Sequence, residues 1–143
     1  MDTAGQEVYK ALVESYYKKA DCCLLVYDIT NKNSFLEIKN YYSKNIKEKC
    51  KPNIKVILLG NKTDLENREV SSKEGVDLSL EHNYTFMETS CLKNHNVADA
   101  FETLIEETNR EAVNQQIANQ QMANSNIQIN NTQITSKSSS CFC

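Results

Sequence analysis

The sequence predicts an α/β protein whose core is an open sheet of about three parallel strands, with helices on both faces. Three short apolar runs are typical of buried strands, and each is separated from the next by a helical pattern. Strands that alternate with single helices pair in parallel through right-handed crossovers. The 143 residues suffice for one domain of this kind.

The predicted strands are the apolar runs 22–27, 54–59 and 84–88. Between the first two strands, Ser34 and Glu37 have the spacing of a capping box, which predicts a helix start. Ser71 and Glu74 predict a second helix start before the third strand. Apolar residues at helical spacing over 97–105 predict a last helix.

Composition excludes several classes of protein. The net charge of −3 argues against a nucleic-acid-binding protein, which needs a basic surface. The apolar runs are far shorter than the roughly 18 residues that span a bilayer. Without a secretory signal the six cysteines are expected to stay reduced, and their spacing fits no zinc site.

The composition changes near residue 111. The last 33 residues include 12 Asn or Gln and only four Ile, too few apolar side chains to offset the entropy of ordering. We therefore expect a folded domain over 1–113 and a disordered, Asn/Gln/Ser-rich tail over 114–143.

A polar segment, Asn61-Lys62-Thr63-Asp64, directly follows the second predicted strand. The Asp64 carboxylate can accept two N–H bonds from guanine, whereas adenine offers no such pair of donors. Lys62 can cover a flat ring, and Asn61 can connect neighbouring loops. Asn and Asp are also ordinary turn residues, so by itself this motif leaves a simple turn open.

Two further segments become informative beside the first. Thr89-Ser90-Cys91 follows the third predicted strand, so its N–H groups are expected at the same edge of the sheet. Asp2-Thr3-Ala4-Gly5-Gln6-Glu7 combines a glycine that allows close approach of a phosphate, a glutamine that can orient water and an acid suited to a magnesium shell. The alternatives are a helix start for the former and a polar N-terminus for the latter.

Together these segments resemble the small GTPases of the Ras superfamily. Asp2 to Glu7 matches the family's D-T-A-G-Q-E switch segment, Asn61 to Asp64 matches its base-reading motif, and Glu88 to Cys91 is similar to its E-T-S-A motif. Within the superfamily the chain looks like a Rab protein, because segments 16–20 and 25–30 resemble Y-Y-R-G-A and L-V-Y-D-I-T. The resemblance extends to about residue 110.

The resemblance implies a partial doubly wound P-loop GTPase fold and a GTP-binding, GTP-hydrolysing switch in vesicle-mediated membrane and protein transport. Its cofactors would be GTP or GDP and Mg²⁺. Gln6 would position the attacking water, Gly5 would bond the γ-phosphate through its N–H, and Asp2 would act on Mg²⁺ through water.

The same resemblance implies that Asp64 selects guanine while Asn61 and Lys62 hold the loop and the ring. The residues expected to contact the base side are Ser90, Cys91 and Leu92. Family members often have a lysine at the position of Leu92, so this chain lacks a stacking lysine there.

The last three residues, Cys141-Phe142-Cys143, form the C-x-C ending of prenylated Rab proteins. One lipid gives only marginal membrane binding and Lys137 is the only base of the tail, so we expect geranylgeranyl groups on both cysteines. Two incidental cysteines are the alternative.

Such an anchor would place the protein on the cytosolic face of intracellular membranes, cycling with the cytosol. The partners implied are Rab escort protein, geranylgeranyl transferase, GDP-dissociation inhibitor, an exchange factor, a GTPase-activating protein and effectors.

The family's phosphate loop, G-x-x-x-x-G-K-[ST], cannot be formed from these residues, because the three glycines stand at positions 5, 60 and 75. We therefore expect the C-terminal part of a longer GTPase, marginally stable and unable to hydrolyse GTP by itself. The alternative is a non-catalytic prenylated Rab fragment that binds escort proteins or membranes.

Overall fold

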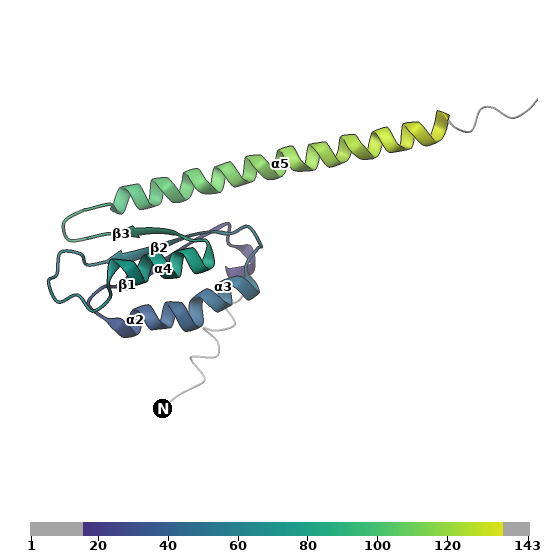
Figure 1. Cartoon of the computed structure of the whole chain (residues 1–143). Coiled ribbons are helices and arrows are strands. Elements are labelled where there is room, and N and C mark those ends of the chain that lie inside the picture. The colour runs from purple at the N-terminus through teal and green to yellow at the C-terminus, as the bar shows by residue number, and fades with distance from the viewer. Residues whose placement is uncertain (1–15, 136–143) are drawn as a thin grey trace, which may run out of the picture. The chain divides into compact units, whose positions relative to one another are not determined.

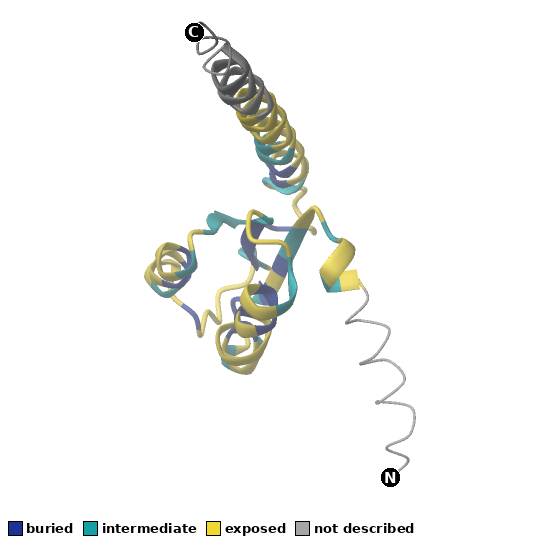
Figure 2. Ribbon diagram, turned by 90° about the vertical axis from the view of Figure 1, so that its right-hand side faces the viewer, coloured by how far each residue is buried: buried dark blue, intermediate teal, exposed yellow. Residues whose placement is uncertain are grey.

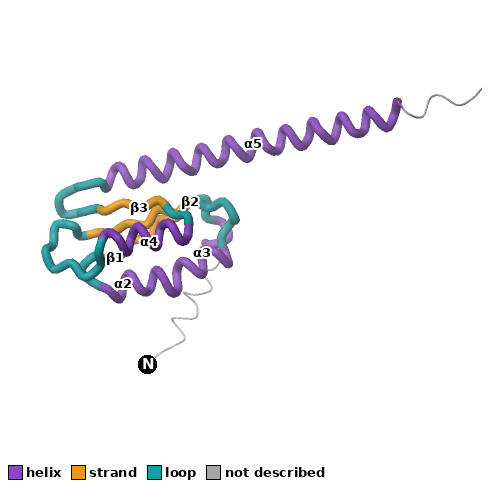
Figure 3. The backbone as a smooth tube through the Cα atoms, in the orientation of Figure 1, coloured by secondary structure: helices purple, strands orange, loops and turns teal. Residues whose placement is uncertain are grey.

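The computed structural model describes residues 16–135, with side chains described as far as residue 122. Three parallel strands form one sheet in the order β1-β2-β3, so the predicted α/β architecture is confirmed (Figure 1 and Figure 3). The strands are β1 (Cys22–Asp28), β2 (Lys55–Asn61) and β3 (Thr85–Glu88). The helices are α2 (Lys32–Glu37), the π-helical η1 (Ile38–Tyr42), α3 (Ser43–Lys49), α4 (Ser72–His82) and α5 (Val97–Thr135).

The central strand β2 supplies the core on both faces of the sheet, since its side chains alternate in direction. Leu58 belongs to the cluster formed with α2, η1, α3 and α4, whereas Ile57 packs with Ala100 and Leu104 of α5. Both β2 residues are fully buried, and each such side chain stabilises the fold by roughly 1.5–3 kcal/mol. Figure 2 shows the buried residues gathered in the strands and on the inward sides of the helices.

Strand β1 is less covered than the sequence predicts. Among the described residues it pairs with β2 alone, so its other side is an edge. Leu25 and Tyr27 are buried, but Val26, which points to the opposite face, is 53% exposed. The apolar run 22–27 is therefore not buried on both faces, because Ala100 and Leu104 of α5 pack against β2 and leave Val26 open.

The predicted capping box at Ser34 is wrong, and α2 begins three residues earlier than that box implies. Asn31 is the N-cap, and its Oδ1 accepts from the N–H groups of Asn33 at 3.0 Å and Ser34 at 3.3 Å. The Ser34 hydroxyl instead donates to the Asn31 carbonyl at 2.7 Å. The second box is confirmed, because Ser71 and Glu74 cap α4 reciprocally.

Several large apolar residues of the helices are exposed. The π-helical turn of η1 adds a residue per turn, which rotates Tyr41 and Tyr42 outward. On α4, Leu78 is buried but Leu80 is 75% exposed. On α5, Phe101 is 53% exposed although its neighbour Ala100 is fully buried. Spacing alone therefore predicted a wider apolar face than these helices bury.

The contacts divide the chain into two compact units, Met1–Thr108 and Asn109–Cys143. The described part of the second unit is helical to Thr135, where composition predicts disorder. A helix outside a packed core depends on intrinsic propensity, and Asn is a weak helix former. The disordered tail over 114–143 stays a prediction. None of the described helices is long and apolar enough to cross a membrane.

Candidate functional site

The candidate site lies where the three strands end. The register places Asp28 of β1 beside Asn61 of β2, and Gly60 beside Glu88 of β3. The loops that follow the strands therefore begin at one edge of the sheet. In open parallel sheets, this carboxyl edge is where ligands bind.

Asn61 connects two of these loops through one atom. Its Oδ1 accepts from the Thr89 hydroxyl at 3.2 Å and from the Cys91 N–H at 3.3 Å. The Thr89 N–H donates to the Gly60 carbonyl at 2.9 Å, which continues the pairing of β2 with β3 past its end. The two segments that the sequence singled out are therefore held side by side.

Asp64 is hydrogen-bonded to Ser90 of the loop that follows β3. The Ser90 hydroxyl donates to Oδ1 of Asp64 at 2.5 Å and accepts from the Lys93 N–H at 3.1 Å. Ser90 is 1% exposed, so the hydroxyl that fixes Asp64 is itself held in place. Within the described part of the chain, Oδ2 of Asp64 makes no hydrogen bond and can accept from a ligand.

Lys62 stands in the left-handed region, with φ of 70°, and forms an ion pair with Asp28. Its Nζ lies 2.6 Å from Oδ2 of Asp28, while Oδ1 accepts from the N–H and the hydroxyl of Thr30 at 2.8 and 2.7 Å. Burial alone would raise the pKa of Asp28, but these hydrogen bonds and the ammonium outweigh it and lower the pKa. Asp28 therefore stays ionised and holds the ammonium group of Lys62 beside the end of β1.

Further hydrogen bonds connect the segment that follows β2 to the end of β3. Thr63 donates to the Thr89 carbonyl through its N–H at 3.2 Å and its hydroxyl at 3.1 Å. Arg68 binds Glu88 through two hydrogen bonds of 2.7 and 3.2 Å, and Ser72 donates to the same carboxylate. Burial raises the pKa of Glu88, but the bonds from Arg68 and Ser72 outweigh it and lower the pKa.

The loop after β3 presents an exposed tip. Ser90 and His95 exchange backbone hydrogen bonds of 3.1 and 2.9 Å, which closes the loop at its base. Leu92 at the tip is 83% exposed, and Cys91 is exposed as well. The loop is therefore fixed at its base and accessible at its tip.

Five of the residues selected from the sequence thus lie close together: Asn61, Lys62, Asp64, Ser90 and Cys91. The predicted catalytic and phosphate-side residues Asp2, Gly5 and Gln6, and the predicted lipidated Cys141 and Cys143, lie outside the described residues. No group of metal-ligating side chains occurs between residues 16 and 122.

Sequence reasoning missed the supporting residues. Asp28 directly follows the first predicted strand, and its pairing with Lys62 depends on the register of β1 against β2. The signal available was position, since a carboxylate that ends a parallel strand lies at the ligand-binding edge. Nothing in the local sequence predicts the pair formed by Arg68 and Glu88.

Comparison with known proteins agrees with this geometry. The model of the Ras family matches residues 1–110. The Ras-related protein Rab-8A of Bos taurus is 43% identical over 107 residues, which cover 74% of this chain and 51% of the relative. Rab-17 of Homo sapiens is 44% identical over 108 residues, with 74% and 50% covered, and the GTP-binding protein ypt3 of Schizosaccharomyces pombe is 43% identical over 110 residues, with 76% and 51% covered.

The extent of the family match defines the class of protein. The chain belongs to the Ras family, and its relatives identify it as a Rab-type small GTPase. It spans about half the length of the relatives that it matches.

Proposed function

We propose that this chain supplies the guanine-reading half of a GTP-binding molecular switch that acts in vesicle-mediated membrane transport. The observation that carries this proposal is the attachment of Asp64 to the loop after β3, which leaves one carboxylate oxygen without a hydrogen bond among the described residues. Asp64 is fixed by Ser90 through one carboxylate oxygen, and the two loops are joined by Asn61. A carboxylate held in this way can receive the ring N–H and the exocyclic amine of guanine.

This arrangement favours guanine over adenine by the direction of its hydrogen bonds. An ionised carboxylate only accepts, and guanine offers two adjacent donors where adenine offers an acceptor and a C–H. Hydrogen bonds to a charged group are worth roughly 1.5–3 kcal/mol each. The Lys62 stem, tethered to Asp28, can lie over one face of the ring.

On the phosphate side we assign Gln6 to the attacking water, Gly5 to the γ-phosphate and Asp2 to the water shell of Mg²⁺. These roles rest on the family resemblance of the switch segment. We propose that hydrolysis needs a phosphate loop in addition to these 143 residues, because the three glycines cannot form one. The intact mass of the native protein distinguishes a longer GTPase from a non-catalytic fragment.

The test of the base-reading assignment is Asp64→Asn in the protein expressed from its own gene. Asn keeps one acceptor but turns an N–H donor toward the exocyclic amine of guanine. We expect guanine nucleotide binding to weaken by roughly a hundredfold or more, about 3 kcal/mol. Xanthine carries a carbonyl in place of that amine, so the variant should prefer a xanthine nucleotide.

Fluorescence titration with both nucleotides measures the two effects. Asp77→Asn on the exposed side of α4 is the matched control, with the same chemical change away from the site. Unchanged affinity for the guanine nucleotide in the Asp64 variant would contradict the assignment of Asp64 as the residue that binds the base.

We further propose that geranylgeranyl groups on Cys141 and Cys143 anchor the protein to the cytosolic face of intracellular membranes. The C-x-C ending supports this, as do the Rab relatives. Replacing both cysteines by serine should move the protein into the soluble fraction of cells, because one or no lipid gives little membrane affinity. Cys22→Ser is the control, and persistent membrane association of the double variant argues against the anchor.

A further inference from the structure

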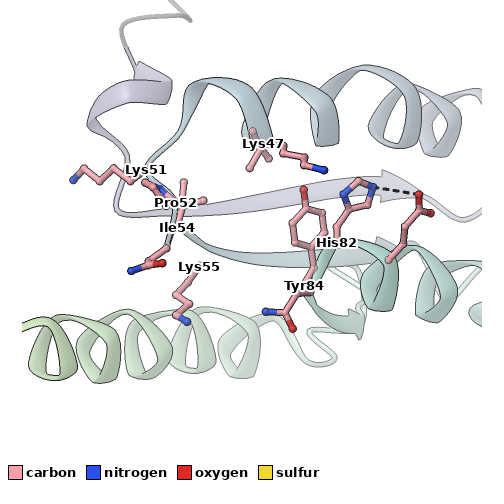
Figure 4. A pocket seen from close by; sticks show the side chains of 11 residues that line it. Lys47, Lys51, Pro52, Ile54, Lys55, His82 and Tyr84 are labelled. Carbon is pink, nitrogen blue, oxygen red and sulfur yellow. Dashed lines mark ion pairs between the residues drawn. The ribbon is translucent and has the colours of Figure 1, made fainter. Parts of the chain in front are cut away.

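A pocket lies at the opposite edge of the sheet from the proposed nucleotide site. It is a cavity of about 360 Å³ bounded by the end of α3, the chain that leads into β2, and the end of α4 (Figure 4). Strand β2 begins at this pocket and ends at Asn61, and its seven residues span about 20 Å. The two sites are therefore separate, and the size of the pocket is within the usual range for a small ligand.

One part of the pocket wall is aromatic and apolar. The rings of His82 and Tyr84 stack with their centroids 5.3 Å apart and an interplanar angle of 18°. Figure 4 shows the Tyr84 hydroxyl directed toward the helix that carries Lys47. Ile46 and Ile54 also line the cavity. Burial raises the pKa of Tyr84, so its hydroxyl stays a neutral hydrogen-bonding group.

The rim is cationic in a chain that is acidic as a whole. Three lysines line the pocket, Lys47, Lys51 and Lys55, although the net charge of the protein is −3. Lys47 lines the pocket and makes no ion pair with any described residue. Lys51 is paired with Asp21, but the pair is exposed and such pairs exchange partners at little cost. One carboxylate, Glu81, also lines the pocket, 4.0 Å from Nε2 of His82.

We propose that this pocket binds a small phosphorylated ring of the inositol phosphate type. The phosphate groups would bind Lys47 and Lys51, and the C–H face of the ring would lie against Tyr84 and His82. An ammonium–phosphate bond is charge-assisted, and a flat apolar wall beside two cations suits a ring that carries anions at its edge. The headgroup of a membrane inositol lipid and a soluble inositol phosphate share this chemistry.

The test titrates the full chain with inositol trisphosphate and follows backbone amide signals by NMR. Shifts are expected at Lys47, Asn53 and Tyr84, and none at Ser90 at the other edge. Lys47→Gln combined with Lys51→Gln should weaken binding about tenfold or more, because each lost contact is a hydrogen bond to a charged group.

The matched control is Lys39→Gln combined with Lys44→Gln. It removes the same charge from the same part of the chain, but neither lysine lines the pocket. A loss below about threefold is expected. Equal losses in the two double variants would overturn the proposal, since they would show a diffuse electrostatic surface.

The lysines at the end of α3 also favour that helix terminus, and this simpler role makes a different prediction. If the lysines only stabilise the helix end, the pocket variant has a lower melting temperature and the wild-type protein does not bind inositol trisphosphate. Absence of binding to the wild-type protein would overturn the proposal. Vesicles of phosphatidylcholine with and without phosphatidylinositol bisphosphate identify the source. Binding to the inositol lipid vesicles indicates a headgroup, whereas binding of inositol trisphosphate alone indicates a soluble ligand.

Discussion

Gly75 determines how closely α4 approaches the sheet. A Cβ at this position would lie 2.5 Å from Cε2 and Cζ of Phe86 and 2.7 Å from the hydroxyl oxygen of Tyr27. The Tyr27 hydroxyl is buried without a hydrogen-bond partner among the described residues, and burial raises the pKa of Tyr27 to about 12. The Tyr27 hydroxyl and the ring of Phe86 thus pack directly against Gly75 and leave no room for a methyl group.

Gly75→Ala should therefore destabilise the fold. In an exposed helix the change would stabilise by about 1 kcal/mol, but overpacking a core costs roughly 1–3 kcal/mol. With contacts this short, the cost of overpacking should exceed the gain in helix propensity, and the free energy of unfolding should fall by about 1–2 kcal/mol. Urea denaturation measures it. Lys73→Ala on the exposed side of α4 is the control and should stay within about 0.5 kcal/mol; a stabilised Gly75 variant would contradict the packing.

The residues that meet at the candidate site could be selected from the sequence because each follows a strand. Asn61 and Asp64 come after one apolar run and Ser90 after the next, and parallel strands end at a common edge. The pairs that support them could not be predicted. Lys62 with Asp28 and Arg68 with Glu88 depend on strand register and loop path, which are tertiary properties.

Helices α2 and α4 are connected by an ion pair. Lys32 at the start of α2 forms an ion pair with Glu74 in the first turn of α4, and its N–H donates to Glu69 at 2.9 Å. Glu74 also completes the capping box with Ser71. The hydrogen bond from Lys32 and those from Ser71 lower the pKa of Glu74 to about 2.

This lowered pKa predicts a stability that depends on pH. Because the Glu74 carboxyl has a lower pKa in the folded protein than its ordinary 4.5, its contribution is present above about pH 4.5 and is lost as the pH falls toward about 2. The urea midpoints of wild type and Glu74→Gln should differ near neutral pH and converge under acid. High salt should shrink the difference, since the pair is partly exposed.

The exposed Glu66, which forms no ion pair with described residues, offers the control Glu66→Gln. Its difference from wild type should be small at every pH. A difference between wild type and the Glu74 variant that stays constant under acid would contradict the lowered pKa, and coinciding curves would show that the ionised carboxyl contributes nothing.

The two helix starts show what local sequence can predict. The capping box at Ser71 was correct because both of its partners lie within four residues. The box at Ser34 failed because Asn31, an equally good N-cap, stands three residues earlier. The Ser34 hydroxyl donates to the carbonyl groups of Asp28 and Asn31 instead. The prediction of which helix residues are buried was less accurate, because burial depends on tertiary packing. Spacing identifies an apolar stripe but not the elements that cover it.

On the scale of the whole molecule, the chain separates into Met1–Thr108 and Asn109–Cys143. Every buried residue of the two core clusters belongs to the first unit. In the second unit Val113, Ile117 and Met122 are about half exposed or more. The first unit therefore carries the burial of apolar surface that stabilises the fold.

Removing residues 114–143 should leave the stability of the remaining domain within about 0.5 kcal/mol of the full chain, because no core residue is lost. A peptide of residues 109–135 should show only partial helicity by circular dichroism, since an Asn-rich helix has little intrinsic stability. Full helicity of the peptide would contradict the predicted disordered tail. A large loss of stability on truncation would show that the second unit supports the first.

Strand β2 links the two candidate sites in a way that amide hydrogen exchange can resolve. It is hydrogen-bonded on both sides, to β1 and to β3, and Ile57 and Leu58 are fully buried. Its central amides should exchange only when the whole domain opens, whereas the loops at either end exchange through local fluctuations. A ligand at one edge therefore slows exchange at that edge, while the centre of β2 reports the added stability of the entire domain. Exchange rates along this one strand and its flanking loops thus report both the occupancy of each site and the increase in the domain's free energy of unfolding.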